Sequence, residues 1–317
     1  MKQAMIPLAG AALRWYFRRF PIAYGKLAVW DKVVRRVLLW RHMQIVAPMR
    51  FGALIDGRFP DLIHSRIYIF GVWEPGITWL ITAHLRAGDT MIDIGANVGV
   101  HTLLAAHLVG TAGTVVAIEA SPAIFQRLVA NLRLNGAAQV QAVNTAVSDT
   151  PGRLTVFLAP DGNLGKTTTL GNEASTMGAA HEAEVDAQPL PNILTMAQIG
   201  AARLIKIDVE GAEWRVLQGM RDVLAHGLAE DCVVLVEIST RALEALGGSA
   251  AGVIGMFQQG GLEPRHIVNR YDVGFYVRPP RRFIEQVPAA FDEADIAFAR
   301  PDVWRHLESL QAAHQRA

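Results

Sequence analysis

Glycines and an acidic residue close a short apolar run in MIDIGANVG, residues 91–99. The run ends at Asp93, Gly95 permits a tight turn, and Gly99 lets a helix that starts near residue 98 approach closely. Such a turn offers free backbone N–H groups, so it predicts a nucleotide-like ligand. The glycines do not form the G-x-G-x-x-G fingerprint of dinucleotide-binding proteins. A carboxylate at Asp93 repels a pyrophosphate and attracts an ammonium group, which favours S-adenosylmethionine over NAD.

The next apolar run, VVAIEAS at residues 115–121, places Glu119 at its end. An acid there accepts hydrogen bonds from both ribose hydroxyls, and it serves NAD and S-adenosylmethionine equally well. Asn144 follows the third run, where it either meets the adenine or is a turn residue that tolerates loop geometry. We include Ser121 and Asn144 among the predicted cofactor-binding residues.

A third segment, RLIKIDVEGAE at residues 203–213, alternates charged with apolar residues. Lys206, Asp208 and Glu210 therefore point one way from a strand that we expect to be buried on both faces. Because an unpaired buried charge is costly, we predict that Lys206 pairs with a carboxylate. Asp208 and Glu210 come at the carboxyl end, where open α/β sheets bind ligands, so we predict a functional role for them. Glu237, at the end of VVLVEIS, points to the same edge.

Short β-branched runs alternate with helical patterns from residue 90 onward, which predicts an α/β fold with a doubly wound, mostly parallel sheet. The predicted strands are 90–94, 114–119, 140–143, 153–158, 204–209, 232–238, 265–268 and 275–278. The last two are joined by about six residues, so we expect them to form an antiparallel hairpin at a sheet edge. In the connecting stretch 48–75 the most strand-like piece is 66–70, and 162–178 is the longest loop. We expect a basic helical extension over 1–65, the α/β domain over 66–280 and a helical tail over 281–317.

The charge of the chain is divided unevenly along its 317 residues, although the formal net charge is only +1. Residues 1–50 hold ten Lys or Arg and one acid, a charge of +9, so the remaining 267 residues carry −8. Residues 11–47 have helical periodicity and place Trp15, Trp30 and Trp40 beside basic residues. This pattern is typical of a helix on an anionic membrane, which residues 11–50 would contact, and equally of a helical pair that caps the body. The acidic body argues against nucleic acid as a partner.

The single cysteine, Cys232, lies in an apolar run and is interpreted as a buried thiol, which favours a reducing compartment. The apolar stretch 4–13 runs into arginines and does not read as a signal peptide, and no stretch is long enough to span a membrane. We expect a bacterial cytoplasmic protein, with a peripheral position at the inner face of the membrane left open. A homo-oligomer is also left open.

Several motifs occur in one order over residues 70–240: WEP at 73–75, DIGANVG at 93–99, AVSD at 146–149, GNLGKTTTL at 162–170, KIDVEGAE at 206–213 and VEI at 236–238. Taken together, they resemble the FkbM family of S-adenosylmethionine-dependent methyltransferases. The resemblance implies the class I methyltransferase fold, a seven-stranded Rossmann-like sheet with one antiparallel strand. It also implies O-methylation of a hydroxyl on a sugar, glycolipid or natural product.

Carried over residue by residue, the resemblance implies that Asp93, Gly95, Asn97 and Gly99 line the methionine and ribose region of the cofactor. Glu119 would hold the ribose, and Asp208 and Glu210 would border the acceptor. Either of these two acids is then the expected general base, with His101 as a rival. No metal is predicted, although oxygen ligands from Asp208, Glu210 and Glu237 would suit magnesium. The alternatives are a non-catalytic membrane-surface binding protein on the same fold and, less favoured, an NAD-dependent enzyme.

Overall fold

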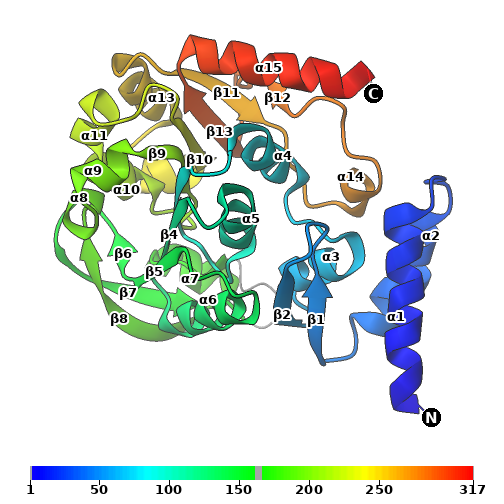
Figure 1. Ribbon diagram of the computed structural model, residues 1–317. Coiled ribbons are helices and arrows are strands. Elements are labelled where there is room, and N and C mark those ends of the chain that lie inside the picture. The colour runs from blue at the N-terminus through cyan, green and yellow to red at the C-terminus, as the bar shows by residue number, and fades with distance from the viewer. Residues whose placement is uncertain (1, 161–165, 317) are drawn as a thin grey trace.

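The computed structural model describes residues 2–160 and 166–316, and a mixed eight-stranded sheet forms its centre (Figure 1). The spatial order of the strands is β12-β11-β13-β10-β9-β3-β4-β5. Their bounds are β3 Thr90–Ile94, β4 Thr114–Glu119, β5 Val140–Asn144, β9 Ala202–Ile207, β10 Val233–Ser239, β11 Glu263–Ile267, β12 Ile284–Glu285 and β13 Glu293–Ala299. The five strands from β10 to β5 run parallel, whereas β13 is antiparallel to both β10 and β11.

Alternate residues of the central strands enter two different cores, as the period-two geometry of a strand requires. Val116 and Ile118 of β4 face one core, and Val115 and Ala117 face the other side of the sheet. The first core is closed by α8 Leu190–Ile193, α9 Met196–Gly200, α10 Glu213–Gly219, α11 Arg221–His226, α12 Thr240–Ala245 and α13 Ala250–Gln259. The opposite face is covered by α4 Pro75–His84, α5 Val100–Val109, α6 Pro122–Leu134 and α15 Pro301–Arg316. The predicted α/β class with helices on both faces is therefore confirmed.

The predicted hairpin of 265–268 with 275–278 is wrong. Residues Val273–Val277 form helix α14, which Asp272 caps by accepting a hydrogen bond from the Phe275 backbone N–H at 3.0 Å. The antiparallel partners of β11 are β13 and β12, so the segment predicted as a helical tail contributes two strands to the sheet. The composition VGFYV resembles a strand because this helix is short and buries Phe275 and Tyr276. With β12 added at the edge, the sheet has eight strands rather than seven, and two of them run against the rest.

The predicted strand at 66–70 is also wrong, because these residues belong to helix α3, Leu62–Phe70. Asp61 caps this helix, and its Oδ1 accepts from the His64 N–H at 3.0 Å. Every residue from Ile63 to Phe70 is buried, so the helix shows no amphipathic period. A helix of this kind cannot be told from a buried strand by its sequence pattern.

A separate three-stranded sheet stands beside the main one in the order β6-β8-β7. Its strands are β6 Ala146–Val147, β7 Gly152–Leu158 and β8 Ala180–Gln188. The sequence predicted β7 but not β8. Part of the predicted loop 162–178 forms helix α7, Gly171–Met177, while 162–165 lie outside the described residues.

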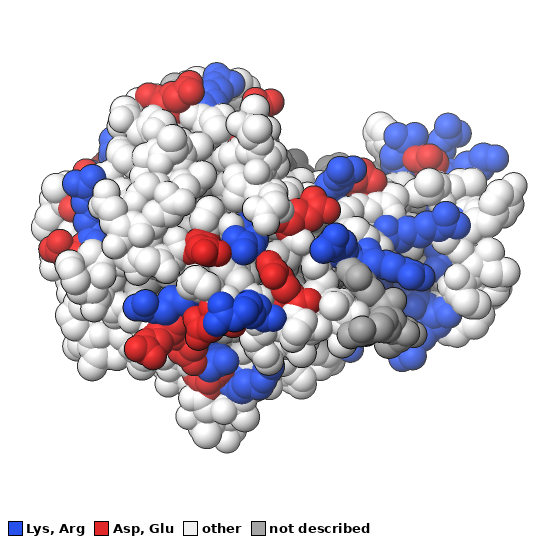
Figure 2. Space-filling view, turned by 90° about the horizontal axis from the view of Figure 1, so that it is seen from above, with Lys and Arg blue, Asp and Glu red and all other residues white. Residues whose placement is uncertain are grey.

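The N-terminal segment consists of α1 Lys2–Arg19, α2 Lys26–Val29, the π-helix η1 Trp30–Leu38 and the hairpin β1 Gln44–Pro48 with β2 Leu54–Arg58. The helices pack on the body through aromatic side chains: Trp30 stacks on Phe70 with ring centroids 5.6 Å apart, and Phe70 lies 5.2 Å from Tyr276. The boundary expected at residue 65 falls inside α3, and the extension shares its core with α5 and α6. Figure 2 shows Lys and Arg gathered on the side of the molecule that these helices form. No helix in the described part of the chain is long and apolar enough to cross a membrane.

Candidate active site

A cavity opens at the carboxyl ends of β3, β4, β9 and β10. The chain winds outward in opposite directions from β3 and β9, so this edge is the switch point at which open α/β sheets bind ligands. Of the predicted site residues, Gly95, Asn97, Glu119, Ser121, Asp208 and Glu210 line the cavity.

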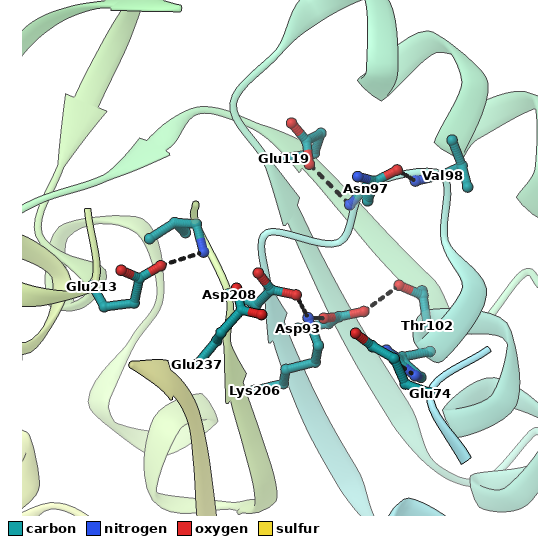
Figure 3. Close-up of polar contacts among 12 residues, drawn as sticks. Glu74, Asp93, Asn97, Val98, Thr102, Glu119, Lys206, Asp208, Glu213 and Glu237 are labelled. Carbon is teal, nitrogen blue, oxygen red and sulfur yellow. Dashed lines mark hydrogen bonds and ion pairs between the residues drawn. The ribbon is translucent and has the colours of Figure 1, made fainter. Parts of the chain in front are cut away.

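One end of the cavity is built around Glu119, at the end of β4. Its carboxylate accepts hydrogen bonds from the backbone N–H of Asn97 and of Ser121, each at 2.9 Å. Figure 3 shows the bond from Asn97. Burial raises the pKa of Glu119 to about 7. Ser121 caps α6 by accepting from the Ile124 N–H at 3.2 Å, which fixes the loop after β4. These contacts hold the carboxylate at the cavity wall with further lone pairs available to a ligand.

The two glycines in the loop after β3, Gly95 and Gly99, are needed for different close contacts. Gly95 adopts φ +80°, and a Cβ there would lie 1.6 Å from the carbonyl oxygen of Asp208. This glycine therefore lets the loops after β3 and β9 touch. Gly99 adopts φ +89°, and a Cβ would lie 2.6 Å from Leu128 Cδ1 of α6, so it serves helix packing and does not line the cavity.

Two other predicted cofactor-binding residues also lie outside the cavity lining. Asp93 is 1% exposed, and its Oδ2 accepts from Thr102 Oγ1 at 2.6 Å. The acid expected to meet an ammonium group of the cofactor thus lies beneath the floor of the cavity and pairs with the chain's own groups. The amide of Asn144 donates to the backbone carbonyls of Glu119 and Ala120 at 2.8 and 3.1 Å. Of its two predicted roles, contact with the adenine or a turn residue, these bonds fit the turn residue.

Lys206 is the cation at the centre of the site. It lies opposite Asp93 in the register of β3 and β9, and its Nζ is 2.8 Å from Asp208 Oδ2 and 3.8 Å from Asp93 Oδ1 (Figure 3). The prediction that Lys206 pairs with a carboxylate is confirmed. Burial alone would lower its pKa, but Asp208 and Asp93 raise it above the ordinary value. The same ion pair outweighs burial at Asp208 and lowers the pKa of that carboxyl.

Three acids cluster above this ion pair. Asp208, Glu210 and Glu237 each place a carboxylate oxygen within 4.8 Å of the others. Burial and the charge of Asp208 raise the pKa of Glu210 and of Glu237 well above the ordinary value. These three acids are the residues whose oxygen atoms would suit magnesium. Lys206 already balances the charge of one of them, Asp208.

The sequence reasoning missed Glu74 and Tyr271, which line the same cavity. The Tyr271 hydroxyl donates to Glu74 Oε1 at 2.8 Å, and His101 Nε2 lies 3.7 Å from Glu74 Oε2. Burial, and then the charge of Asp208, raises the pKa of Glu74 to about 7. Burial lowers the pKa of His101 to about 3, which makes this imidazole a weak base. The WEP motif could have identified Glu74, whereas nothing near Tyr271 in the sequence marks it.

Backbone strain is concentrated at this cavity. Glu74, Asn97 and Glu210 have φ angles of 45°, 51° and 54°, and they are the non-glycine residues with positive φ in the described ranges. All three line the cavity. A non-glycine residue with a positive φ angle costs about 1–3 kcal/mol of backbone strain. Such residues persist where the surrounding structure enforces the conformation, commonly at functional sites.

The residues of the cavity fit the predicted cofactor, S-adenosylmethionine. Glu119 has acceptor capacity for ribose hydroxyls, and the acids around Asp208 favour a ligand with positive charge. The same acids repel a pyrophosphate, so NAD fits this cavity poorly. Asp93 does not contribute to this repulsion, because its side chain lies against Lys206 outside the cavity lining.

Comparison with known proteins gives one family match and two similar curated sequences. The Methyltransferase FkbM domain matches residues 93–261. "Methyltransferase 1" of Beauveria bassiana (strain ARSEF 2860) is 30% identical over 176 residues, which cover 51% of this chain and 68% of that protein. "31-O-demethyl-FK506 methyltransferase FkbM" of Streptomyces tacrolimicus is 33% identical over 163 residues, which cover 44% of this chain and 62% of that protein.

Similar solved structures are more remote. Fibrillarin from Aeropyrum pernix, in complex with natively bound S-adenosyl-L-methionine, is 12% identical with a TM-score of 0.39 and covers 82% of this chain and all of its own. Precorrin-6y C5,15-methyltransferase from Geobacter metallireducens GS-15 is 15% identical with a TM-score of 0.37 and covers 70% of this chain and 85% of its own.

Proposed function

The chain belongs to the FkbM family of methyltransferases, and from this membership we propose that it transfers a methyl group from S-adenosylmethionine to a hydroxyl group of a sugar, glycolipid or natural-product acceptor. The observation that carries the proposal is the division of the cavity into two ends. Glu119 and Asn97 form one end, and the acids around Asp208 form the other. One relative, named as a 31-O-demethyl-FK506 methyltransferase, supports oxygen as the atom that is methylated.

The residues around Glu119 would hold the cofactor. The Glu119 carboxylate accepts ribose hydroxyls at the end of β4, as acids in this position do in related folds. Its position is fixed by the N–H groups of Asn97 and Ser121. When bound, S-adenosylmethionine supplies an electrophilic methyl group carried on a sulfonium.

The chain's own task is to align the acceptor hydroxyl, exclude water and take up the hydroxyl proton. Glu210 is the better proton acceptor of the two candidates, because burial and then the charge of Asp208 raise its pKa well above the ordinary value, which makes its carboxylate the stronger base. Asp208 stays ionised through Lys206 and is suited to accept a hydrogen bond that orients the hydroxyl. Glu74 and Tyr271 close the opposite wall of this end.

The direct test is transfer of an isotopically labelled methyl group from S-adenosylmethionine into a lysate of the native host, with separation of lipid, polysaccharide and small-molecule pools. The purified full chain is compared with Asp208→Asn, Glu210→Gln and the control Glu230→Gln, an exposed acid that does not line the cavity. We expect label in one pool as an alkali-stable methyl ether. Glu210→Gln should lower the rate about 10²- to 10⁴-fold, as loss of a proton-transfer group does, and Asp208→Asn should lower the rate because the acceptor hydroxyl loses its orienting hydrogen bond.

Two results would overturn the proposal. Label confined to nitrogen, carbon or carboxyl esters would refute O-methylation of a hydroxyl. Full turnover in both Asp208→Asn and Glu210→Gln would remove these acids from the chemistry even if the reaction itself were confirmed.

A further inference from the structure

The N-terminal helices expose an unusual number of large apolar side chains. Twelve such side chains are exposed in the described part of the chain, and seven of them lie between residues 15 and 40. They are Trp15, Ile22, Tyr24, Leu27, Val33, Val37 and Trp40. Trp40 is 78% exposed and Tyr24 is 88% exposed, so these rings lack the burial that ordinarily stabilises large aromatic side chains.

These exposed side chains are not the inner face of the helices. The inner face consists of Phe17, Trp30, Val34 and Leu38, which are buried against the body. The packing of the extension on the body is therefore complete without the seven exposed side chains. These seven residues and the exposed basic residues of the same segment, Arg19, Lys32, Arg35, Arg36 and Arg41, are here called the outer surface.

The outer surface is strongly basic. Arg19, Lys32, Arg35, Arg36 and Arg41 are exposed in this segment, and Arg14 and Arg18 are partly buried beside them. Its one acid, Asp31, lies 3.5 Å from Arg35 and offsets a single charge. Exposed aromatic and aliphatic side chains among Arg and Lys are the composition of a helix that lies in the interface of an anionic membrane.

An arginine pocket lies at one end of this surface. It is lined by Arg14, Trp15, Arg18, Arg19, Met49 and Arg50. Within the described residues, no ion pair joins any of its four guanidinium groups to a carboxylate. Burial and the neighbouring Arg14 and Arg50 lower the pKa of Arg18 to about 10. An anion in the pocket would relieve this repulsion.

The pocket is held in place by the body. Arg18 donates to the carbonyls of Ile67, Tyr68 and Ile69 at the end of α3, at 2.9, 2.9 and 3.0 Å, and Arg50 Nε donates to the Phe70 carbonyl at 2.9 Å. These bonds fix two of the four guanidinium groups. Arg14 lies over the Tyr68 ring at 4.7 Å, and Arg19 is exposed.

We propose that the outer surface docks on an anionic phospholipid membrane, with Trp15, Tyr24, Leu27 and Trp40 entering the headgroup region and the arginine pocket taking a lipid phosphate. Charge complementarity selects the membrane as the occupant. The exposed Ile22, Leu27, Val33 and Val37 favour it over nucleic acid, because aliphatic side chains gain burial in lipid but meet no apolar surface on a phosphate backbone. The proposal does not depend on the acceptor of the methyl group.

The test is flotation of the full chain with vesicles of pure phosphatidylcholine and with vesicles containing phosphatidylglycerol, at low and high salt. We expect binding to the phosphatidylglycerol vesicles alone, weakened by salt. Arg19→Gln with Arg36→Gln should reduce the partition coefficient by about 25-fold, because each of the two charges contributes about fivefold. Trp15→Ser with Trp40→Ser should reduce it by about tenfold or more, from the apolar area no longer buried.

Matched controls come from exposed residues elsewhere on the body. Arg221→Gln with Arg241→Gln and Leu134→Ser with Met196→Ser change the same residue properties and should leave the partition coefficient within about twofold. Equal binding to both vesicle types, or equal loss in the controls, would overturn the proposal. So would a concentration-dependent dimer that Trp15→Ser with Trp40→Ser abolishes, because a second copy would then cover the surface. Binding of a 20-base-pair duplex as tight as that of vesicles would overturn it as well.

Discussion

The Nζ of Lys206 lies 2.8 Å from Oδ2 of Asp208, and this pair connects the buried floor of the cavity to its open acidic end. Lys206 is 3% exposed and belongs to β9, whereas Asp208 follows the strand and lines the cavity. The same ammonium faces Asp93 in the neighbouring strand. One buried cation therefore both balances Asp93 below it and lowers the pKa of Asp208 above it.

Replacing Lys206 by Met should destabilise the fold, because Asp93 and Asp208 then lose their cation. Breaking a buried ion pair by removing one partner costs about 3–5 kcal/mol. Urea unfolding of Lys206→Met and of Lys206→Met with Asp93→Asn measures the effect. The double variant should recover part of the loss, since Asn removes one unpaired buried charge. A stability of Lys206→Met equal to that of the unchanged chain would contradict the role given to this pair.

Replacing Glu119 by Ala should weaken binding of S-adenosylmethionine by about 10- to 100-fold, the effect of losing one hydrogen bond to a charged acceptor. Titration calorimetry measures the affinity, and thermal unfolding checks that the loop after β4 remains folded. The control is Gln141→Ala, an exposed residue of β5 outside the cavity lining, which should bind normally. Unchanged affinity in Glu119→Ala would remove this acid from the cofactor site.

The parallel part of the sheet could be predicted from the sequence because β3, β4, β9 and β10 are short runs rich in aliphatic residues that are followed by polar residues. These ends also identified Glu119 and Asp208. The strand β13 could not be predicted, because its neighbours in the sheet, β10 and β11, precede it in the chain with helices between. Its place is decided by tertiary packing, which local pattern does not encode.

The acceptor end of the site was predicted only in part for a similar reason. Tyr271 and Glu74 are 197 residues apart and meet only in the fold. Asp93 shows the opposite error: its place at a strand end indicated a ligand contact, but its side chain points to the helix-covered face, where Thr102 donates to Oδ2 and Lys206 lies 3.8 Å from Oδ1. The position of a residue along a strand could be predicted, whereas the partner that its side chain finds could not.

Chelation of divalent metal should leave turnover unchanged. Asp208, Glu210 and Glu237 lie close together, but the ammonium group of Lys206, 2.8 Å from Asp208, already balances the charge that would attract a divalent cation to that acid. The measurement is the methyl-transfer rate of the full chain before and after EDTA and dialysis. A loss of activity that magnesium restores would show that these three acids need a cation.

The buried Glu213 should make the fold less stable as the pH rises toward neutrality. Its Oε1 accepts from the backbone N–H of Val209 and Gly211 at 3.0 and 3.1 Å, yet burial raises its pKa to about 7 from an ordinary 4.5. The folded chain then keeps a proton that the unfolded chain releases between these values. The resulting stabilisation is complete below pH 4.5 and is lost as the pH rises through 7, by about 3 kcal/mol in total.

Glu213→Gln removes this titration while keeping an oxygen that can accept both N–H bonds. Urea unfolding of the variant and of the unchanged chain should therefore give free energies that converge near pH 4.5 and diverge in favour of the variant by pH 8. Glu74 and Glu119 also have pKa values near 7, so the variant should keep part of the original slope. Glu230→Gln, at an exposed position, is the control and should follow the unchanged chain at every pH. Parallel pH profiles for Glu213→Gln and the unchanged chain would mean that Glu213 titrates normally despite its burial.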